Sequence, residues 1–500
     1  MPTIAQDSTE QITLLAIDGH LLPFKRNLCF YMSKPCVRKE PVLVPGRDDP
    51  TAPDHLAAQF YGTVLRDGDQ FRMWYYSVGC GSGEELRLGP VCYAQSEDGI
   101  HWTKPKLGQV SIEGSRDNNA LKLTGTKTYG VAVIKDVDDP DPGRRYKMVY
   151  NAIDRQENWV EPALAGHARS TLRTATSADG LHWTVRPDFP LDVFVELSSA
   201  HQHDGLFIAH GQGKLREEGG ALHGRRGYAW VSTDFNHWVQ GQAETFALPE
   251  PSDTSQRGVG GQYDQVHLGV GAASYGSVVV GLYGLWHEQG WGLGGTTCDL
   301  GLVVSNDGIH FHEPAKGHIF ISHENSSVTP VAGKPYPTIL CQANGILHVA
   351  EQTRIYHGRW RNAPHDLDYY GEVALATIPR DRWGALGLVP GAEDGWVWSA
   401  PIQLPGGNSQ FFLNADFFWL LQIEISDAQF NLLPEYSGPN SGAASDAERG
   451  AGIPHENGAL DCPVVWPGAE LSALRGKTVR FRVHLKNSQG QPRIFAMYIR

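Results

Sequence analysis

The residues with the clearest chemical potential lie in GLYGLWHEQGWGLGG, residues 281–295. Trp286, His287 and Glu288 end a strongly apolar run and enter a loop rich in Gly and Trp. Apolar surroundings raise the pKa of a Glu towards that of a working proton donor. Because a Trp ring is a common platform for a sugar face, this stretch predicts acid–base chemistry on a carbohydrate. The rival interpretation is a Trp packed between sheets, followed by an exposed Glu.

A second candidate stretch, HVAEQTRIYHGRW at 348–360, offers Glu351, Arg354 and His357. An Arg beside a carboxylate keeps that carboxylate ionised, which suits a general base or a substrate clamp. The same residues also fit an ion pair between neighbouring sheets.

An acidic motif that recurs along the chain has a different explanation. SEDGIHW at residue 96 returns as SADGLHW at 177 and SNDGIHF at 305, and more loosely as STDFNHW at 232 and TIPRDRW at 377. Asp-Gly between apolar runs is a hairpin signal, because Gly supplies a positive φ at little cost. Recurrence favours a structural role, so Glu97, Asp98 and His101 are predicted to form a turn and not a catalytic cluster.

A histidine-rich run, HQHD at 201–204, has the alternation expected of a metal site on one strand face. However, its His-Asp-Gly occupies the place of a hairpin turn in the other repeats. We therefore predict a turn here, and no metal or other cofactor in the protein.

The repeats predict the fold. Two apolar strands joined by a turn precede each copy of the motif, as in FYGTVL, RDGD and QFRMWYYS. Five such units predict an all-β chain whose main part is a five-bladed β-propeller, a closed ring with few free sheet edges. After about residue 400 the copies stop and alternating strands predict a small β-sandwich. The expected division is an N-terminal arm at 1–40, the propeller at 41–400 and the sandwich at 401–500.

Composition and charge narrow the class of protein. The 500 residues include 57 Gly, 14 Trp and 18 Tyr, which favours strands. The formal net charge is −13 without a block of Lys or Arg, so we expect neither a nucleic-acid nor a membrane partner. No secretory signal is visible and the seven Cys form no CxxC pair, so we expect a cytoplasmic protein with free thiols. The sandwich is a candidate interface for a homo-oligomer.

The motif copies, together with DNNALKL (117–123), RRYKMVY (144–150) and GRDDP (46–50), resemble the glycoside-hydrolase-like five-bladed propeller proteins. These are relatives of glycoside hydrolase families 32, 43 and 117, often with a C-terminal β-sandwich. The resemblance covers nearly the whole chain. The W-x-N-D-P-N-G, R-D-P and W-E-C-P motifs of family 32 are absent, so the resemblance transfers no catalytic residue.

The resemblance implies an active site in an axial funnel, on loops that enter the innermost strands and leave the second strands. Two carboxyl groups would flank the scissile bond there, about 5 Å apart for retention and about 6.5–9.5 Å apart for inversion. The candidate catalytic residues are Glu288, Glu351, Asp264, Glu196 and Asp54. The candidate substrate-binding residues are Trp286, His287, Arg354, His357, His55 and His267.

Together these features predict a glycoside hydrolase, with transglycosylation left open, that acts on the end of an oligosaccharide or glycoside. Exo-action follows from a closed funnel, which a chain end enters most easily. One alternative is a non-catalytic carbohydrate-binding propeller, which would lack a carboxylate pair at catalytic spacing. Another is a His-based or metal-assisted carbohydrate lyase or hydrolase, suggested by the 21 His.

Overall fold

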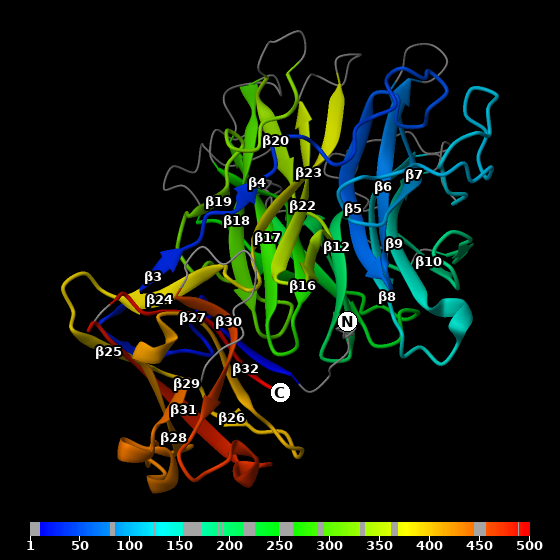
Figure 1. Cartoon of the computed structure of the whole chain (residues 1–500). Coiled ribbons are helices and arrows are strands. Elements are labelled where there is room, and N and C mark those ends of the chain that lie inside the picture. The colour runs from blue at the N-terminus through cyan, green and yellow to red at the C-terminus, as the bar shows by residue number, and fades with distance from the viewer. Residues whose placement is uncertain are drawn as a thin grey trace, which may run out of the picture.

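The structure is a computed structural model that describes residues 11–80, 86–123, 127–153, 172–188, 190–191, 195–213, 226–249, 264–287, 295–330, 336–361, 369–444, 457–488 and 490–500. Regular elements in these ranges are β-strands and 3-10 helices of three or four residues. The strands form curled sheets (Figure 1). The all-β class expected from the composition is therefore confirmed.

Most of the chain forms successive groups of antiparallel strands, in which consecutive strands pair with each other. Buried aromatic runs such as RMWYYSV within β6 suit a strand covered on both faces. The first three groups are β5 (Ala57–Asp67), β6 (Gln70–Cys80) and β7 (Leu86–Ser96); β8 (Lys127–Lys135), β9 (Tyr146–Ile153), β10 (Leu172–Ser177) and β11 (Thr184–Val185); and β12 (Glu196–His203), β13 (Leu206–Gly213), β14 (Arg226–Ser232) and β15 (Ala243–Phe246).

Two further groups follow, and the last is completed by the N-terminal part of the chain. They are β16 (Gln265–Ser274), β17 (Val279–His287), β18 (Thr297–Ser305) and β19 (Ile319–Ile321); and β20 (Thr338–Cys341), β21 (Ile346–Val349), β22 (Gln352–Arg361) and β23 (Tyr370–Pro379). Both β20 and β21 pair with β22, so they are two halves of one strand interrupted at 342–345. The short strand β4 (Cys36–Val37) pairs with the outer edge of β23.

The Ser-x-Asp motifs form turns, as predicted. In the first, Ser96 donates to Asp98 Oδ1 at 3.0 Å, and the same oxygen accepts the backbone N–H of His101 at 2.8 Å. The other carboxylate oxygen lies 2.7 Å from His101 Nδ1. The same Asp–His bonds recur at Asp179, Asp234 and Asp307. Each Asp is therefore engaged in holding its own turn.

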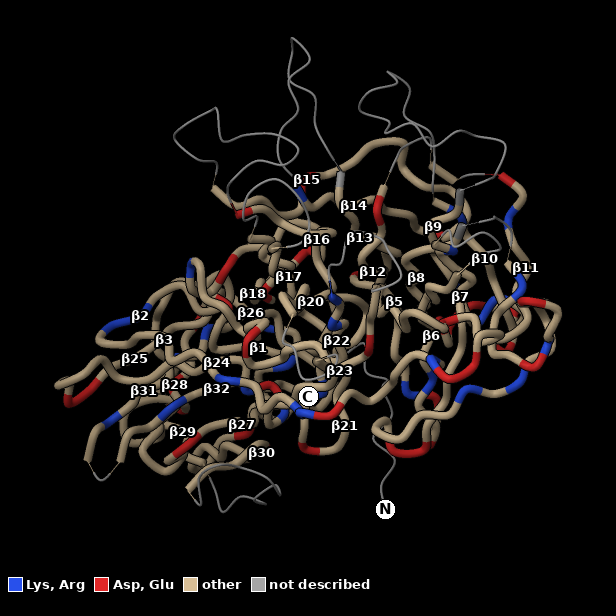
Figure 2. The backbone as a smooth tube through the Cα atoms, turned by 90° about the horizontal axis from the view of Figure 1, so that it is seen from above, with Lys and Arg blue, Asp and Glu red and all other residues tan. Residues whose placement is uncertain are grey.

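These turns link one strand group to the next. The carbonyl of Gly180, in the second turn, accepts the indole N–H of Trp74 on β6 at 3.0 Å. Gly308, in the turn after β18, lies against side chains of β12 and β13. The first turn contacts the last group, because Tyr356 on β22 donates to the Gly99 carbonyl at 2.8 Å. Seen from above, β5, β8, β12, β16 and β20 lie towards the middle, and later strands of each group lie farther out (Figure 2).

A second sheet combines both ends of the chain and lies at the lower left of Figure 1. Its order is β2-β25-β31-β28-β29-β30-β27-β32-β24-β3, with β1 beside β32 and β26 beside β31. The strands are β1 (Ile12–Leu15), β2 (Phe24–Arg26), β3 (Leu28–Met32), β24 (Gly384–Leu388), β25 (Asp394–Trp398), β26 (Ile402–Gln403), β27 (Phe411–Asp416), β28 (Leu421–Asp427), β29 (Gly442–Ala444), β30 (Gly458–Val465), β31 (Thr478–Lys486) and β32 (Arg493–Ile499). The sheet draws strands from all three expected segments, and the division at residues 40 and 400 stays a prediction.

Buried contacts join this sheet to the strand groups. Leu15 and Tyr498 belong to an apolar cluster that also contains residues of β17, β18 and β22. Tyr498 donates to the buried carboxylate of Asp381 at 2.8 Å, and Arg382 pairs with Asp416 at 2.7 Å. The junction therefore has both apolar packing and satisfied buried charges.

All seven cysteines are free thiols. Among the described residues, no helix is long and apolar enough to cross a membrane.

Candidate active site

The strand register brings several of the predicted carboxylates to one end of the strand groups. Glu196 opens β12 and pairs with Gln212 near the end of β13. Gly269, early in β16, lies against Gly211 of β13, so β16 begins at this same end. Asp264 immediately precedes β16. Glu196 and Asp264 therefore lie at the same end of two successive strand groups.

Glu196 is held by an amide that also bonds to β16. The side-chain nitrogen of Gln212 donates to Glu196 Oε2. The Gln212 amide oxygen accepts the backbone N–H of Leu268 at 2.9 Å. Gln212 is buried and Glu196 is partly exposed. A partly exposed carboxyl group with a fixed neutral partner is suited to exchange a proton with a bound ligand.

An aromatic cluster lies beside Glu196. Tyr61, Tyr76 and Trp286 belong to one buried apolar cluster. The Tyr61 hydroxyl lies 3.0 Å from His267 Nε2, and the His267 ring centroid lies 4.6 Å from that of Trp286. Burial raises the pKa of Tyr76 well above its usual value, and the neighbouring Glu196 adds to this rise. Trp286 and His267 are only 4% and 6% exposed, so their rings pack in the interior and offer little surface to a sugar.

Four titratable side chains form a hydrogen-bonded chain next to this cluster. Asp264 Oδ1 lies 2.7 Å from His287 Nδ1, and His287 Nε2 lies 2.8 Å from Asp299 Oδ2. Asp299 Oδ1 accepts both the backbone N–H of His323 at 2.6 Å and its Nδ1 at 2.7 Å. This series of hydrogen bonds runs from the start of β16, through β17 and β18, to the segment after β19. It links the exposed Asp264 to the buried Asp299.

The bonding favours the charged form of His287. Both ring nitrogens face carboxylate oxygens, an arrangement that favours a proton on each nitrogen and the imidazolium form of the ring. The bond to Asp299 is the main cause that raises the pKa of His287, burial opposes it, and Asp264 contributes further. Burial alone would raise the pKa of Asp299, but bonds from His287 and His323 hold it below its usual value. With both N–H groups engaged, His287 has no ring donor left for the sugar hydroxyl that we expected it to bind.

Asp54, another predicted carboxylate, is already paired. Its side chain is 1% exposed and bonds to Lys104 and, at 2.9 Å, to the Tyr75 hydroxyl. Tyr75 lies on β6, and Lys104 lies in the segment after the first turn. His55, beside it, is partly exposed in the segment before β5. Asp54 shortly precedes β5, whose Ala57 lies level with the start of β16 through Gly371 and Trp360, so Asp54 lies at the same end as Asp264. Its carboxylate is held there in an ion pair with Lys104.

The structure places Glu351 and Arg354 at the opposite end of the strand groups. Glu351 lies in the turn between β21 and β22, whereas the other end of β22 pairs with Thr338. Ile339 pairs with Cys298, which itself pairs with Trp286, so that other end lies level with the start of β16. Ten residues of β22, at about 3.3 Å each, separate the two ends by about 30 Å.

This separation excludes Glu351 as the catalytic partner of Glu196 or Asp264, since paired carboxylates act within about 10 Å. Arg354 instead donates to the carbonyl of Asp98 in the first turn. His357, also predicted to bind substrate, is fully buried and bonds to Ser326 Oγ at 2.7 Å. Glu351 and Arg354 therefore lie at the end away from Glu196, and His357 is enclosed in the interior.

Glu288, the leading acid of the sequence analysis, lies outside the described residues. Sequence reasoning missed Asp299, His323 and Gln212. A lone Asp inside the apolar run TCDLGLVVS was the available signal for Asp299. Within the described part of the chain, no group of three or more His, Cys, Asp or Glu is arranged to hold a metal ion.

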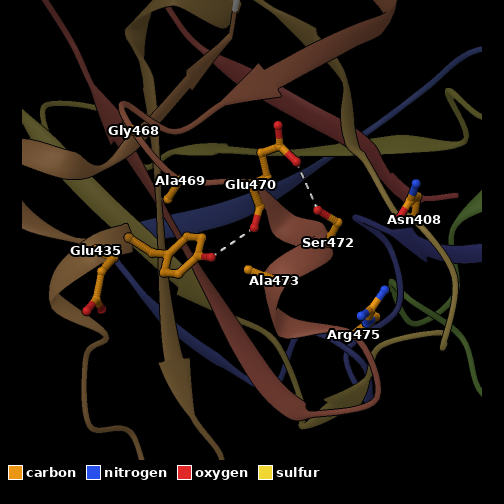
Figure 3. Close-up of a pocket in the computed structure, with 9 residues that line it drawn as sticks. Asn408, Glu435, Gly468, Ala469, Glu470, Ser472, Ala473 and Arg475 are labelled. Carbon is orange, nitrogen blue, oxygen red and sulfur yellow. Dashed lines mark hydrogen bonds between the residues drawn. The ribbon is translucent and has the colours of Figure 1, made fainter.

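A cleft of about 590 Å³ lies in the other sheet, away from these residues. Figure 3 shows Glu435, Glu470 and Arg475 around it. The Glu470 carbonyl accepts the Tyr436 hydroxyl at 2.8 Å, and its carboxylate accepts Ser472 Oγ at 3.1 Å. The cleft is therefore separate from the candidate active site.

Comparisons with known proteins place this geometry in context. No family model matches the chain. Two curated relatives, the uncharacterized proteins MT1551 and Rv1502 of Mycobacterium tuberculosis, are each 28% identical over 168 residues, which is 31% of this chain and 47% of the relative. The chain thus spans about half the length of the curated relatives it matches.

Solved structures similar to this chain are glycoside-hydrolase-like proteins. One is a glycoside hydrolase family 43 arabinoxylan arabinofuranohydrolase from Bacillus subtilis, with TM-score 0.40 and 12% identity, covering 89% of this chain and 96% of that one. Another is a glycosyl hydrolase from Bacteroides ovatus, with TM-score 0.41 and 14% identity, covering 71% and 95%. At these values we transfer no residue role from them.

Proposed function

We propose that the strand groups form a five-bladed β-propeller whose inner strands begin around the candidate active site. The cyclic order of turn contacts supports this proposal, because the first turn bonds to the last group through Tyr356 and Gly99. The pairing of β4 with β23 also supports it, since an N-terminal strand completing the last group would close such a ring.

We further propose that the protein is a glycosidase acting on a carbohydrate end, with Glu196 and Asp264 as its described carboxylates. The observation that carries this proposal is their placement at one end of neighbouring inner strands, each held by a fixed partner. Asp264 accepts a bond from the His287 imidazolium through Oδ1, and its side chain is 58% exposed. It is suited to act as the ionised base or nucleophile.

Glu196 is assigned the role of proton donor to the leaving group. The neutral amide of Gln212 holds its Oε2, and the Glu196 side chain keeps the partial exposure needed to reach a bound glycoside. The buried aromatic cluster of Tyr61, Tyr76 and Trp286 forms an apolar floor beside it. Glu288 stays a candidate for the same chemistry.

The test is a screen of aryl glycosides and oligosaccharides with the full chain and three variants. E196Q and D264N are each expected to lose at least about 100-fold in turnover, the scale of a lost acid or base. E351Q, whose residue lies at the opposite end, is the matched control and is expected to keep full turnover. Normal turnover by both E196Q and D264N would overturn the assignment, and saturable sugar binding without turnover would favour the binding-protein alternative.

A further inference from the structure

The series of hydrogen bonds that joins Asp264, His287, Asp299 and His323 points to a role for Asp299 and His323, which the sequence did not suggest. We propose that Asp299 and His323 are positioning residues that act through His287 to hold Asp264 in one orientation. The inference rests on the proposed function, because it takes Asp264 as a reacting carboxylate.

The first observation is that both oxygens of Asp299 are fully used. Oδ2 bonds to His287 at 2.8 Å, and Oδ1 accepts two N–H groups of His323 at 2.6 and 2.7 Å. The Asp299 side chain is 3% exposed. Its position is therefore fixed by β18 on one side and by the segment after β19 on the other.

The second observation is that side-chain exposure increases along this series of hydrogen bonds. Exposure rises from 3% at Asp299 to 23% at His287 and 58% at Asp264. A buried ionised group is costly unless it is paired, and apolar packing at the same position would serve stability equally well. A chain of bonds that starts in the interior and ends on a solvent-facing carboxylate is the arrangement expected for orienting that carboxylate.

The third observation concerns the charge of His287. Among the described residues, the charged groups that act on its ring are chiefly Asp299 and Asp264, with His323 behind Asp299. An imidazolium donates at both nitrogens, and an anionic acceptor at each one stabilises its charge. If Asp299 loses its charge, His287 loses a proton at a lower pH and can no longer donate reliably at both ends.

The sign of the pH effect follows. The folded-state pKa of His287 is raised, so its positioning effect is complete at low pH and is lost as pH rises through that raised pKa. Replacing Asp299 by Asn removes the main cause of the rise. The alkaline limb of the rate profile is therefore expected to move to lower pH.

The experiment compares the wild-type chain with D299N and H323Q on a glycoside that the screen identifies. We expect kcat to fall about 10-fold or more, KM to change little, and the alkaline limb of kcat to shift downwards in both. The matched control is H237Q, which removes an exposed imidazole in a comparable bond to Asp234. An unchanged profile in D299N and H323Q would overturn the inference.

A second readout separates this inference from the proposed function. NMR of 15N-histidine-labelled protein, with the His287 signal assigned from its loss in H287Q, follows the ring directly. We expect the His287 titration midpoint to move down in D299N, and to move down less in H323Q, where the carboxylate stays in place. If wild-type protein turns over no glycoside, the proposed function fails while the titration still tests the bonding chain. An identical His287 midpoint in wild type and D299N would contradict the inference whatever the activity.

Discussion

At the scale of single residues, the role open to each carboxylate depends on what it already binds. Asp54 has a cation and a hydroxyl partner in the interior, whereas Glu196 and Asp264 keep exposed surface. His287 looked like a sugar ligand, yet both of its nitrogens are committed to carboxylates. The sequence therefore predicts which residue types lie near strand ends, but it does not predict which of these side chains are already bonded to other residues.

One prediction at this scale concerns Asp54. Replacing it by Asn removes the charge that faces Lys104 while keeping the shape of the side chain. We expect the free energy of unfolding to fall by about 1–3 kcal/mol, the usual range for a hydrogen-bonded charged partner. Urea denaturation measures this loss. Turnover per folded molecule should stay at the wild-type level, and a stable D54N protein without activity would return Asp54 to the catalytic set.

At the scale of elements, the Ser-x-Asp turns have a measurable stabilising role. D98A removes the acceptor of the Ile100 and His101 backbone N–H groups, each bonded at 2.8 Å. We expect a loss of about 2 kcal/mol, or about 1 kcal/mol for each bond. E97A, the adjacent exposed acid in the same turn, is the control and is expected to change stability little. Equal stability of D98A and E97A in urea would show that the Asp bonds do not hold the turn.

A buried pair of histidines gives a prediction for pH. His201 and His210 stack with ring centroids 5.1 Å apart between β12 and β13. Burial lowers the pKa of His210 to about 3, and it also lowers the pKa of His201. An unfolded chain therefore binds protons at these positions below about pH 6.5 while the folded chain does not.

Stability is consequently expected to fall as pH drops below about 6.5, by at most about 1.4 kcal/mol per pH unit for each ring. H210F removes one of the two titrating groups and should flatten this dependence. Urea denaturation of wild type and H210F between about pH 4.5 and 7 measures the two slopes. Parallel slopes would mean that His210 is not the group responsible.

The elements themselves were predictable where the signal is local. Repeated Asp-Gly turns between apolar runs predicted the strand groups, and hydrogen bonding within six residues explains why. In the fifth group, Asn344 and Gly345 have the residue types of a hairpin turn but interrupt one inner strand. The hairpin lies six residues later, beside Glu351, and this shift explains why Glu351 was expected at the active-site end. Pairing of β4 with β23 is non-local and has no sequence signal.

At the scale of the whole molecule, the strand groups and the second sheet that combines both ends of the chain share buried contacts. The apolar cluster around Leu15 and Tyr498 and the buried Arg382–Asp416 pair cross the junction. We expect the chain to unfold in one calorimetric transition, because exposing either body alone would uncover this shared core. Two transitions separated in temperature would show that the bodies are energetically independent, and Y498F should lower the single transition since it removes the bond to Asp381.

Glu196 and Asp264 are proposed to break a glycosidic bond at the end where the inner strands begin. The most direct measurement is an NMR time course of sugar release from an oligosaccharide by wild type, E196Q, D264N and E351Q at equal folded concentration. We predict release by wild type and E351Q, and a loss of at least about 100-fold in E196Q and D264N. Undiminished release by E196Q and D264N, or its loss in E351Q alone, would contradict the account.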